Sequence, residues 1–284
     1  MYMARRTSLS PRVVMMGVAI AAWLTLAIVA PWHNLGDYSG PVSLAIEVWG
    51  WLGWTSVAIA LLVPTPVSLT VIRIIAPMNV VCSFVATAPL AIFASILLCV
   101  IALSSVFVDE MVQGSAYGDE RRFALRTPVP YMAPGVVAWA ALCGALIGGT
   151  LLIAAKNFVA GVPVLLLGLL LARTVPQRLH RLARRWLVIV PVGIVVHDHM
   201  VLGETMMVLR KNIKSFTVVA QAGETADFTG GVAGNRIAIE MLESDKVVLS
   251  EITAKTLGTT IALHVTGFSF APRRLAVALA AITQ

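Results

Sequence analysis

The chain carries two different patterns of hydrophobic and polar positions. Residues 13–175 are almost continuously apolar, whereas the remainder alternates between apolar and polar positions. A run of about 20 apolar residues spans a bilayer as a helix, and alternation with a period of two indicates half-buried strands. The pattern therefore predicts a transmembrane helical domain at residues 1–175 and a β-rich domain at residues 176–284.

Apolar runs predict four clear membrane spans and one ambiguous stretch. The clear spans are residues 13–31, 45–63, 132–154 and 158–174. The first run is long for a signal peptide and lacks a clean cleavage site, so we expect it to remain as an uncleaved span. The stretch 66–108 holds either one span preceded by a surface helix at 67–76, or two short spans joined near Thr87–Pro89.

Charge favours the interpretation with six spans over the one with five. With six, both termini and nearly all loop arginines lie in the cytoplasm, as the positive-inside rule requires. These arginines are Arg5, Arg6, Arg12, Arg121, Arg122, Arg126 and the cluster at residues 173–185. The sequence thus predicts a multi-pass protein of the plasma (cell inner) membrane with cytoplasmic N- and C-termini.

Few residues inside the predicted spans are polar or suited to close helix packing. Arg73 lies near a cytoplasmic span end, where snorkelling to the interface or a buried salt bridge to a partner would accommodate it. Gly144 and Gly148 form a GxxxG pattern, which predicts helix packing within this chain or against a partner.

Two basic segments are candidates for contact with a partner protein or with lipid headgroups. Arg121 and Arg122 lie in the loop 109–131, which is either a docking loop or a solvated loop with local ion pairs. The segment 173–185 is expected to form a short helix at the membrane surface, where basic residues attract anionic phospholipids. The candidate contact residues of this connector are Arg178, Arg181, Arg184 and Arg185.

The C-terminal part predicts seven short strands followed by one helix. The strands are expected at 186–190, 194–198, 205–210, 215–219, 236–242, 247–252 and 259–266, and the helix at 273–282. This order of elements resembles the bacterial pleckstrin-homology-like domain, which implies a small all-β, barrel-like fold with a C-terminal helix. Such a fold is a binding scaffold and does not itself specify a function.

Composition and motifs argue against several classes of chemistry. The chain is 58% hydrophobic and 12% charged, and it has a formal net charge of +7. Its basic residues flank apolar spans and are not interleaved with aromatics, so we expect no nucleic acid partner. No histidine lies within a predicted span and the only acid there is Glu47, which argues against a haem and against a proton pump. Neither a Walker loop, HExxH nor GxSxG occurs.

The sequence therefore predicts no catalytic residue, no metal and no cofactor. The nearest approach to a metal site is His197-Asp198-His199, with Glu204 as a third candidate ligand; the other interpretation is a polar strand end. The three cysteines fall in apolar segments and are expected to be small buried hydrophobes.

Three stretches resemble uncharacterised multi-span membrane proteins of actinobacteria. They begin at Pro64-Thr-Pro66, Gly118-Asp-Glu-Arg-Arg and Arg184-Arg-Trp. Some proteins of this kind accompany the cytochrome bc–oxidase respiratory supercomplex as accessory subunits. The resemblance implies that this supercomplex is the larger membrane complex to which the chain docks.

Three functions follow as hypotheses. The first is a non-catalytic accessory or scaffold subunit of a larger membrane complex. The second is a transporter or lipid-handling protein with an apolar substrate. Broken helices near Pro77 and Pro89, together with a cavity at the third and fourth helices, would support it. The third, an enzyme in the β domain, depends on His197 and His199 alone.

Overall fold

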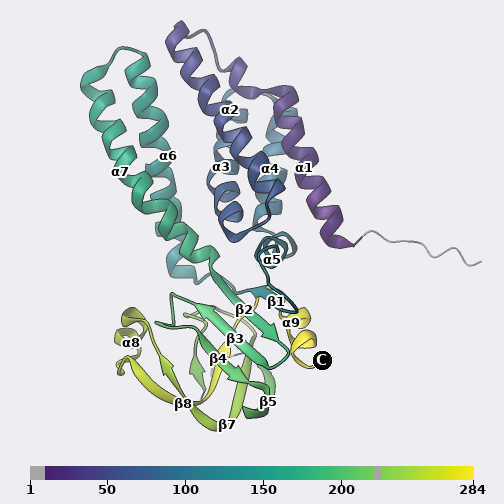
Figure 1. Cartoon of the computed structure of the whole chain (residues 1–284). Coiled ribbons are helices and arrows are strands. Elements are labelled where there is room, and N and C mark those ends of the chain that lie inside the picture. The colour runs from purple at the N-terminus through teal and green to yellow at the C-terminus, as the bar shows by residue number, and fades with distance from the viewer. Residues whose placement is uncertain (1–9, 221–224) are drawn as a thin grey trace, which may run out of the picture.

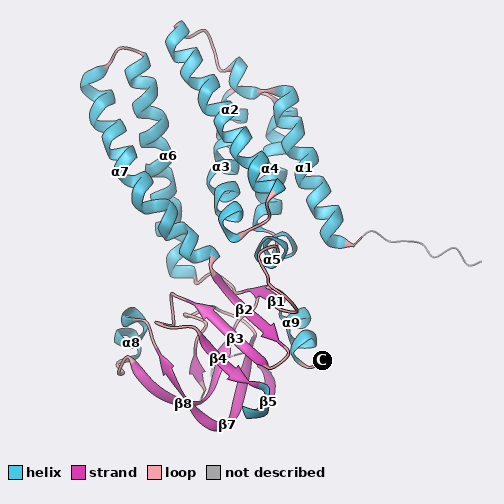
Figure 2. Cartoon of the chain, viewed as in Figure 1, coloured by secondary structure: helices cyan, strands magenta, loops and turns pink. Residues whose placement is uncertain are grey.

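A computed structural model describes residues 10–220 and 225–284 of the chain. Arg5 and Arg6, which contribute to the predicted topology, lie outside these described residues. Helices form one part of the molecule and two sheets form the other (Figures 1 and 2). The helices of the first part are α1 (Pro11–Val29), α2 (Gly40–Leu62), α3 (Pro66–Val85), α4 (Pro89–Leu103), α5 (Ser105–Gln113), α6 (Met132–Ala154) and α7 (Phe158–Ala183).

The helical part offers five or six candidate membrane spans. Five helices are individually long and apolar enough to cross a bilayer. Helices α4 and α5 add a sixth if the pair, bent by 64°, counts as one span. The ambiguous stretch therefore forms the separate helices α3 and α4, joined at Thr87, whose φ of +49° makes the reversal. The join lies where the sequence predicted it.

Helix α5 turns away from α4 and links the membrane helices to the β domain. Ser104 has an extended backbone, and its hydroxyl accepts a hydrogen bond from the Phe107 amide at 3.3 Å, which caps α5. Glu110 on α5 lies 3.5 Å from Arg12 at the start of α1. The start of α1, helix α5 and the β domain thus share one end of the helical bundle (Figure 1).

The helices form two groups, α1–α4 with α5 and the hairpin α6–α7. Within the first group Trp23 stacks on Trp54 at a centroid distance of 4.1 Å, and each indole N–H donates to the backbone carbonyl of the other residue at 3.0 and 3.1 Å. Each buried donor thus has a partner inside the apolar region, where an unpaired one would be costly.

The hairpin α6–α7 depends on glycines that bring the two helices into backbone contact. A Cβ atom on Gly149 would lie 2.5 Å from Leu165 N, and one on Gly168 would lie 2.7 Å from Leu146 N. In the described part of the chain, no atom outside the local backbone of α6 lies within 4 Å of a Cβ built on Gly144 or Gly148. Close packing within the described part of the chain therefore does not use the predicted GxxxG pair.

The β domain consists of two open four-stranded sheets with the strand orders β1-β2-β3-β4 and β5-β7-β8-β6. The first sheet contains β1 (Arg121–Ala124), β2 (Arg185–Val190), β3 (Gly193–Asp198) and β4 (Met206–Leu209); the second contains β5 (Ile213–Val219), β6 (Ala226–Asp227), β7 (Arg236–Val248) and β8 (Ala262–Phe270). The shorter helices are α8 (Glu251–Leu257), α9 (Leu275–Ile282) and the 3₁₀ turns η1 (Pro31–Asn34), η2 (Val129–Tyr131) and η3 (Arg210–Asn212). The predicted barrel is wrong in that the sheets do not close.

Most predicted strands coincide with observed ones, but several features differ, among them the unpredicted β6. The strands expected at 236–242 and 247–252 are one long strand, β7, with a register shift between Glu240 and Asp245. Helix α8 follows it and was expected to be strand and loop. Strand β1 comes from the loop 109–131, which was expected to stand apart from the β domain, and it pairs antiparallel with β2.

The connector at 173–185 is not a separate surface helix. Helix α7 continues through the predicted domain boundary at 175/176 to Ala183, and β2 begins at Arg185. The interior Pro176 does not end the helix. The membrane span and the β domain are therefore joined by one continuous helix.

Strand β2 is buried on both faces. Leu187 and Ile189 belong to the core between the two sheets, together with Phe268 and other apolar residues of β7 and β8. Trp186 and Val188 point the other way and join the core of the helical bundle. Burial on both faces explains why β2 reads as a continuous apolar run.

Candidate functional site

The four connector arginines, predicted as contact residues, have different environments. Arg178 and Arg181 are exposed near the end of α7. The Arg185 side chain is only 1% exposed and forms a bidentate ion pair with Asp198, with Nε 2.9 Å from both carboxylate oxygens and Nη2 2.7 Å from Oδ2. Arg185 also donates to the carbonyl groups of Arg126 and Thr229 at 2.6 and 3.1 Å. The prediction of a lipid or partner contact is therefore wrong for Arg185, whose role is to hold strands together.

Arg121 and Arg122 are neighbours on β1 with different surroundings. Arg121 is exposed, and its guanidinium donates to the Gln284 side chain at 3.3 Å. Arg122 is 16% exposed, pairs with Glu120 and lies 5.6 Å above the Trp186 ring. The local ion pairs expected of a solvated loop are present at Arg122, while Arg121 keeps an accessible charge.

His197 lies in a small aromatic cluster on β3. Its ring stacks on Trp186 at 4.7 Å and meets His199 edge-on at 4.4 Å. Arg184 Nη2 lies 3.4 Å from His197 Nε2, so that Nε2 is the acceptor and Nδ1 donates to Thr205 Oγ1 at 3.1 Å. Among residues 10–220 and 225–284, no three His, Cys, Asp or Glu side chains gather as a metal site.

This neutral histidine predicts a loss of stability in acid. Burial, followed by the charges of His199, Arg184 and Arg122, lowers the pKa of His197 to about 4. The unfolded chain binds a proton near pH 6.5 and the folded one does not, so the stabilisation present above pH 6.5 is lost as the pH falls towards 4. Since the ring is only half-buried and solvent screens its neighbours, we expect an effect of about 1 kcal/mol. Thermal unfolding of the full chain between pH 7.5 and 4.5 measures it.

His197→Gln should flatten this pH profile, and the exposed His264→Gln serves as the matched control that leaves it unchanged. Equal profiles for the two variants would contradict the assignment to His197.

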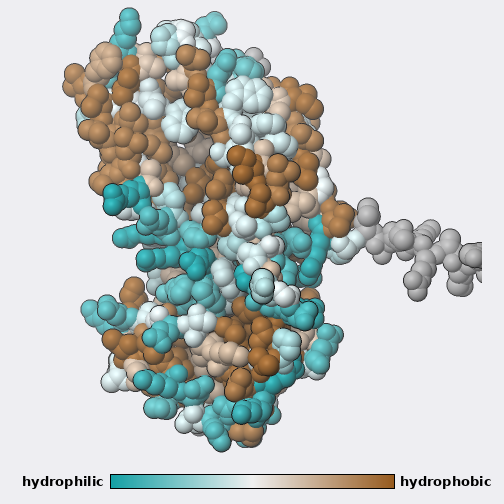
Figure 3. Space-filling view, viewed as in Figure 1, coloured by the Kyte–Doolittle hydropathy of each residue, from teal (hydrophilic) through white to brown (hydrophobic). Residues whose placement is uncertain are grey.

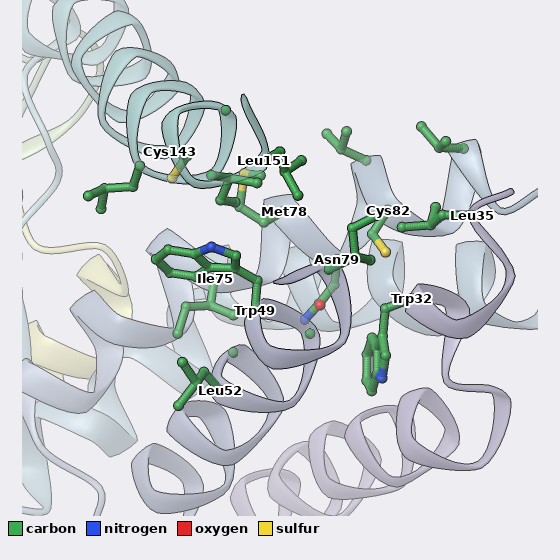
Figure 4. Close-up of a pocket in the computed structure, with 18 of the residues that line it drawn as sticks. Trp32, Leu35, Trp49, Leu52, Ile75, Met78, Asn79, Cys82, Cys143 and Leu151 are labelled. Carbon is green, nitrogen blue, oxygen red and sulfur yellow. The ribbon is translucent and has the colours of Figure 1, made fainter. Parts of the chain in front are cut away.

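One candidate site is an apolar groove of about 760 Å³ between α2, α3 and α6. Figure 4 shows Trp32 and Trp49 on one side and Cys143 and Leu151 of α6 on the other. The lining also includes the small residues Gly50, Gly53, Ser56 and Gly148. The groove lies along the apolar parts of these helices, where the outer surface is hydrophobic (Figure 3).

Two indole side chains join the two helix groups beside this groove. Trp49 on α2 donates to Thr150 Oγ1 on α6 at 2.8 Å. Trp139 on α6 donates to the Ile74 carbonyl on α3, also at 2.8 Å. Among the described residues, Gly148 of α6 has no atom outside the local backbone within 4 Å of a built Cβ, so the groove is open beside it, whereas the Trp32 ring lies directly against Gly50. The cavity thus lies between the two helix groups. The cavity considered from the sequence was at the third and fourth helices, α3 and α4.

Asn79 is the polar group best placed to recognise a ligand in the groove. It belongs to α3, is 7% exposed and lines the cavity. Its side-chain amide has no hydrogen-bond partner among the described residues, although Ser83 donates to its backbone carbonyl at 2.6 Å. Since Asn79 lines the cavity, its amide can donate to and accept from a ligand or water there.

A second cavity of about 640 Å³ lies where α3, α6 and α7 meet the β domain. Arg73, Arg126 and Arg273 line it together with apolar residues of the three helices. Sequence reasoning missed both cavities, because each combines residues from segments far apart in the chain; only the isolated Arg73 inside an apolar run was a signal.

Comparison with family models, curated proteins and solved structures gives no match for this chain.

Proposed function

We propose that this chain is a non-catalytic integral membrane protein that binds an acyl-chain-bearing lipid in the groove between α2, α3 and α6. The observation that supports this proposal is the cavity itself, which offers about 760 Å³ of apolar space within the candidate membrane spans. Ligand sites commonly have about 300–1,000 Å³, mostly apolar walls and a few polar groups that fix orientation. Asn79 is such a polar group, and lipid acyl chains are the apolar molecules most abundant around these helices.

The β domain lies on the cytoplasmic side in this proposal, with both chain termini. The support is the clustering of exposed Arg121, Arg178 and Arg181 at the end of the bundle that adjoins the sheets. The positive-inside rule assigns such an end to the cytoplasm, and the membrane is then the plasma membrane. Exposed arginines at this level also attract anionic phospholipid.

We propose that the β domain, with two sheets and a C-terminal helix, is related in design to a pleckstrin-homology-like domain, although helix α8 interrupts the order of its strands. It departs from that plan in the open sheets, in the strand β1 inserted from between α5 and α6, and in the parallel pairing of β6 with β8. We treat it as a binding scaffold of that general design.

A photo-crosslinking experiment tests the lipid groove. The full chain in nanodiscs containing a phospholipid with a diazirine on its acyl chain should give cross-linked peptides from α2, α3 and α6. Gly148→Leu places an isobutyl group in the groove and should reduce this labelling about tenfold, equivalent to ~1.4 kcal/mol. Gly144→Leu, one turn away on α6 and outside the groove, is the matched control. Equal labelling of both variants would refute the proposal.

A second candidate function is the accessory subunit of a larger membrane complex. Gly144 favours it, because it is exposed with no atom within 4 Å of a built Cβ, and small residues let a partner helix approach closely. Gly144→Leu should then abolish co-purification of a partner in mild detergent, and Gly148→Leu should retain it. Cytochrome absorbance with bc and oxidase subunits in the eluate would identify the respiratory supercomplex as that partner. A colourless eluate with a single polypeptide would remove this candidate.

A further inference from the structure

The cavity beside the β domain contains more positive charge than its surroundings neutralise. Arg73 on α3, Arg126 after β1 and Arg273 before α9 all line it. No carboxylate lies within 4.0 Å of any of these three guanidinium groups within residues 10–220 and 225–284. Asp109 attracts Arg273 from a longer distance, but its ion-pair partner is Arg274, at 3.9 Å.

The contacts that the three arginines do make are with neutral oxygens. Arg73 Nε donates to the Ala102 carbonyl at 3.1 Å, while its Nη2 is buried and has no hydrogen-bond partner among the residues that the structure describes. Arg126 donates to the Ala233 carbonyl at 3.2 Å. Arg273 donates to the Leu103 carbonyl at 3.1 Å and to Thr127 Oγ1 at 3.4 Å. Each guanidinium has five N–H donors, so several on each arginine are left for a ligand.

Placing a cation in a buried or half-buried position without an anion is unfavourable in free energy. Here three such cations come from three separate elements and meet in one cavity. Guanidinium groups pair most strongly with oxyanions that accept two parallel hydrogen bonds, above all phosphate and carboxylate. Three arginines approaching from α3, the β1–α6 loop and the segment before α9 suit a phosphate, whose oxygens point in several directions.

We propose that Arg73, Arg126 and Arg273 bind a phosphate group in this cavity. The opposite wall is apolar, formed by Val136 and Trp139 of α6 and by Leu179 and Leu182 of α7. The cavity is lined by Leu179 and Leu182, the chain neighbours of the exposed Arg178 and Arg181. Figure 3 shows a hydrophilic zone below the hydrophobic surface of the helical bundle. A phosphate next to an apolar wall at this depth is the chemistry of an anionic phospholipid, and a free phosphate or a soluble organic phosphate would use the same donors.

Binding by the full chain in detergent tests the site, with native mass spectrometry as the readout. The probes are phosphatidylglycerol, phosphatidylcholine and inorganic phosphate, each added separately. We expect the unaltered protein to retain a phosphate-bearing probe. Arg126→Gln with Arg273→Gln should weaken its binding about 100-fold, about tenfold for each arginine. Retention of phosphatidylglycerol over phosphatidylcholine identifies a lipid headgroup, whereas displacement by inorganic phosphate alone identifies a free phosphate.

The matched control is Lys246→Gln with Lys255→Gln, which removes two exposed charges of the β domain that do not line the cavity and should change binding by less than about twofold. If the cavity variant does not fold, Arg126→Lys with Arg273→Lys keeps the charge, loses the forked geometry and should bind about tenfold more weakly. Equal losses in the cavity and surface pairs, or no phosphate-bearing probe retained by the unaltered protein, would overturn the proposal. This test is distinguishable from the test of the groove between α2, α3 and α6. Gly148→Leu changes the groove and not the cavity with the three arginines, so it should leave phosphate binding unchanged.

Discussion

Replacing Arg185 with alanine is expected to destabilise the β domain by about 3–5 kcal/mol, the usual cost of removing one partner from a buried ion pair. Asp198, whose side chain is 0% exposed, would keep a hydrogen bond from the Met200 amide at 3.1 Å but no cation. The carbonyl groups of Arg126 and Thr229 would lose their donor as well. Because these partners come from β3, from the segment after β1 and from the segment after β6, one substitution loosens three parts of the domain.

Thermal unfolding of the full chain, together with hydrogen exchange of the β2 and β3 amides, measures this effect. Arg181→Ala is the control, an arginine of the same basic segment that is exposed, with an expected change within about 0.5 kcal/mol. Arg185→Met with Asp198→Leu should recover only part of the loss, since it removes the unpaired charge and leaves the two carbonyl groups without donors. Similar behaviour of Arg185→Ala and Arg181→Ala would show that the pair contributes little.

Replacing Gly149 or Gly168 with alanine is expected to force α6 and α7 apart. The new Cβ atoms would lie 2.5 Å from Leu165 N and 2.7 Å from Leu146 N, and both obstacles are backbone atoms that cannot rotate away. Overpacking of this kind costs about 1–3 kcal/mol for each site, and leucine should prevent the hairpin from closing. The melting temperature of the detergent-solubilised chain and the accessibility of the buried Cys143 thiol to a maleimide report on it.

Gly144→Ala provides the control for this pair, since it changes the same residue type on the same helix in open space. We expect an unchanged or slightly raised melting temperature, because alanine favours a helix over glycine by about 1 kcal/mol. A loss at Gly144 equal to that at Gly149 would place the helix contact on the other face of α6.

Local sequence patterns predict which helices and strands form better than they predict which of these elements lie side by side. The apolar runs gave the helices, and alternation gave most strands, because both depend on periods within one segment. Strand β1 has only four residues between two membrane helices, and nothing near it in the sequence points to β2 as its partner. The open sheets were missed for the same reason, since closure depends on which distant strands pair.

The candidate sites show the same limit at the level of single residues. Arg181 and Arg185 look alike in a basic segment, and only the β2–β3 pairing, which places Arg185 opposite Asp198, separates them. The turn at Pro191-Val-Gly193 marks that hairpin, so counting outward from it would have found the pair. Likewise the GxxxG spacing identifies small residues on α6 but not which of its faces meets α7.

Strand β2 contributes one row of side chains to the core between the sheets and the opposite row to the core of the helical bundle. Neither core can lose this strand without exposing the other. The membrane part and the β domain are therefore coupled in their unfolding and should melt in a single cooperative transition, as one folding unit, although their sequences look like two.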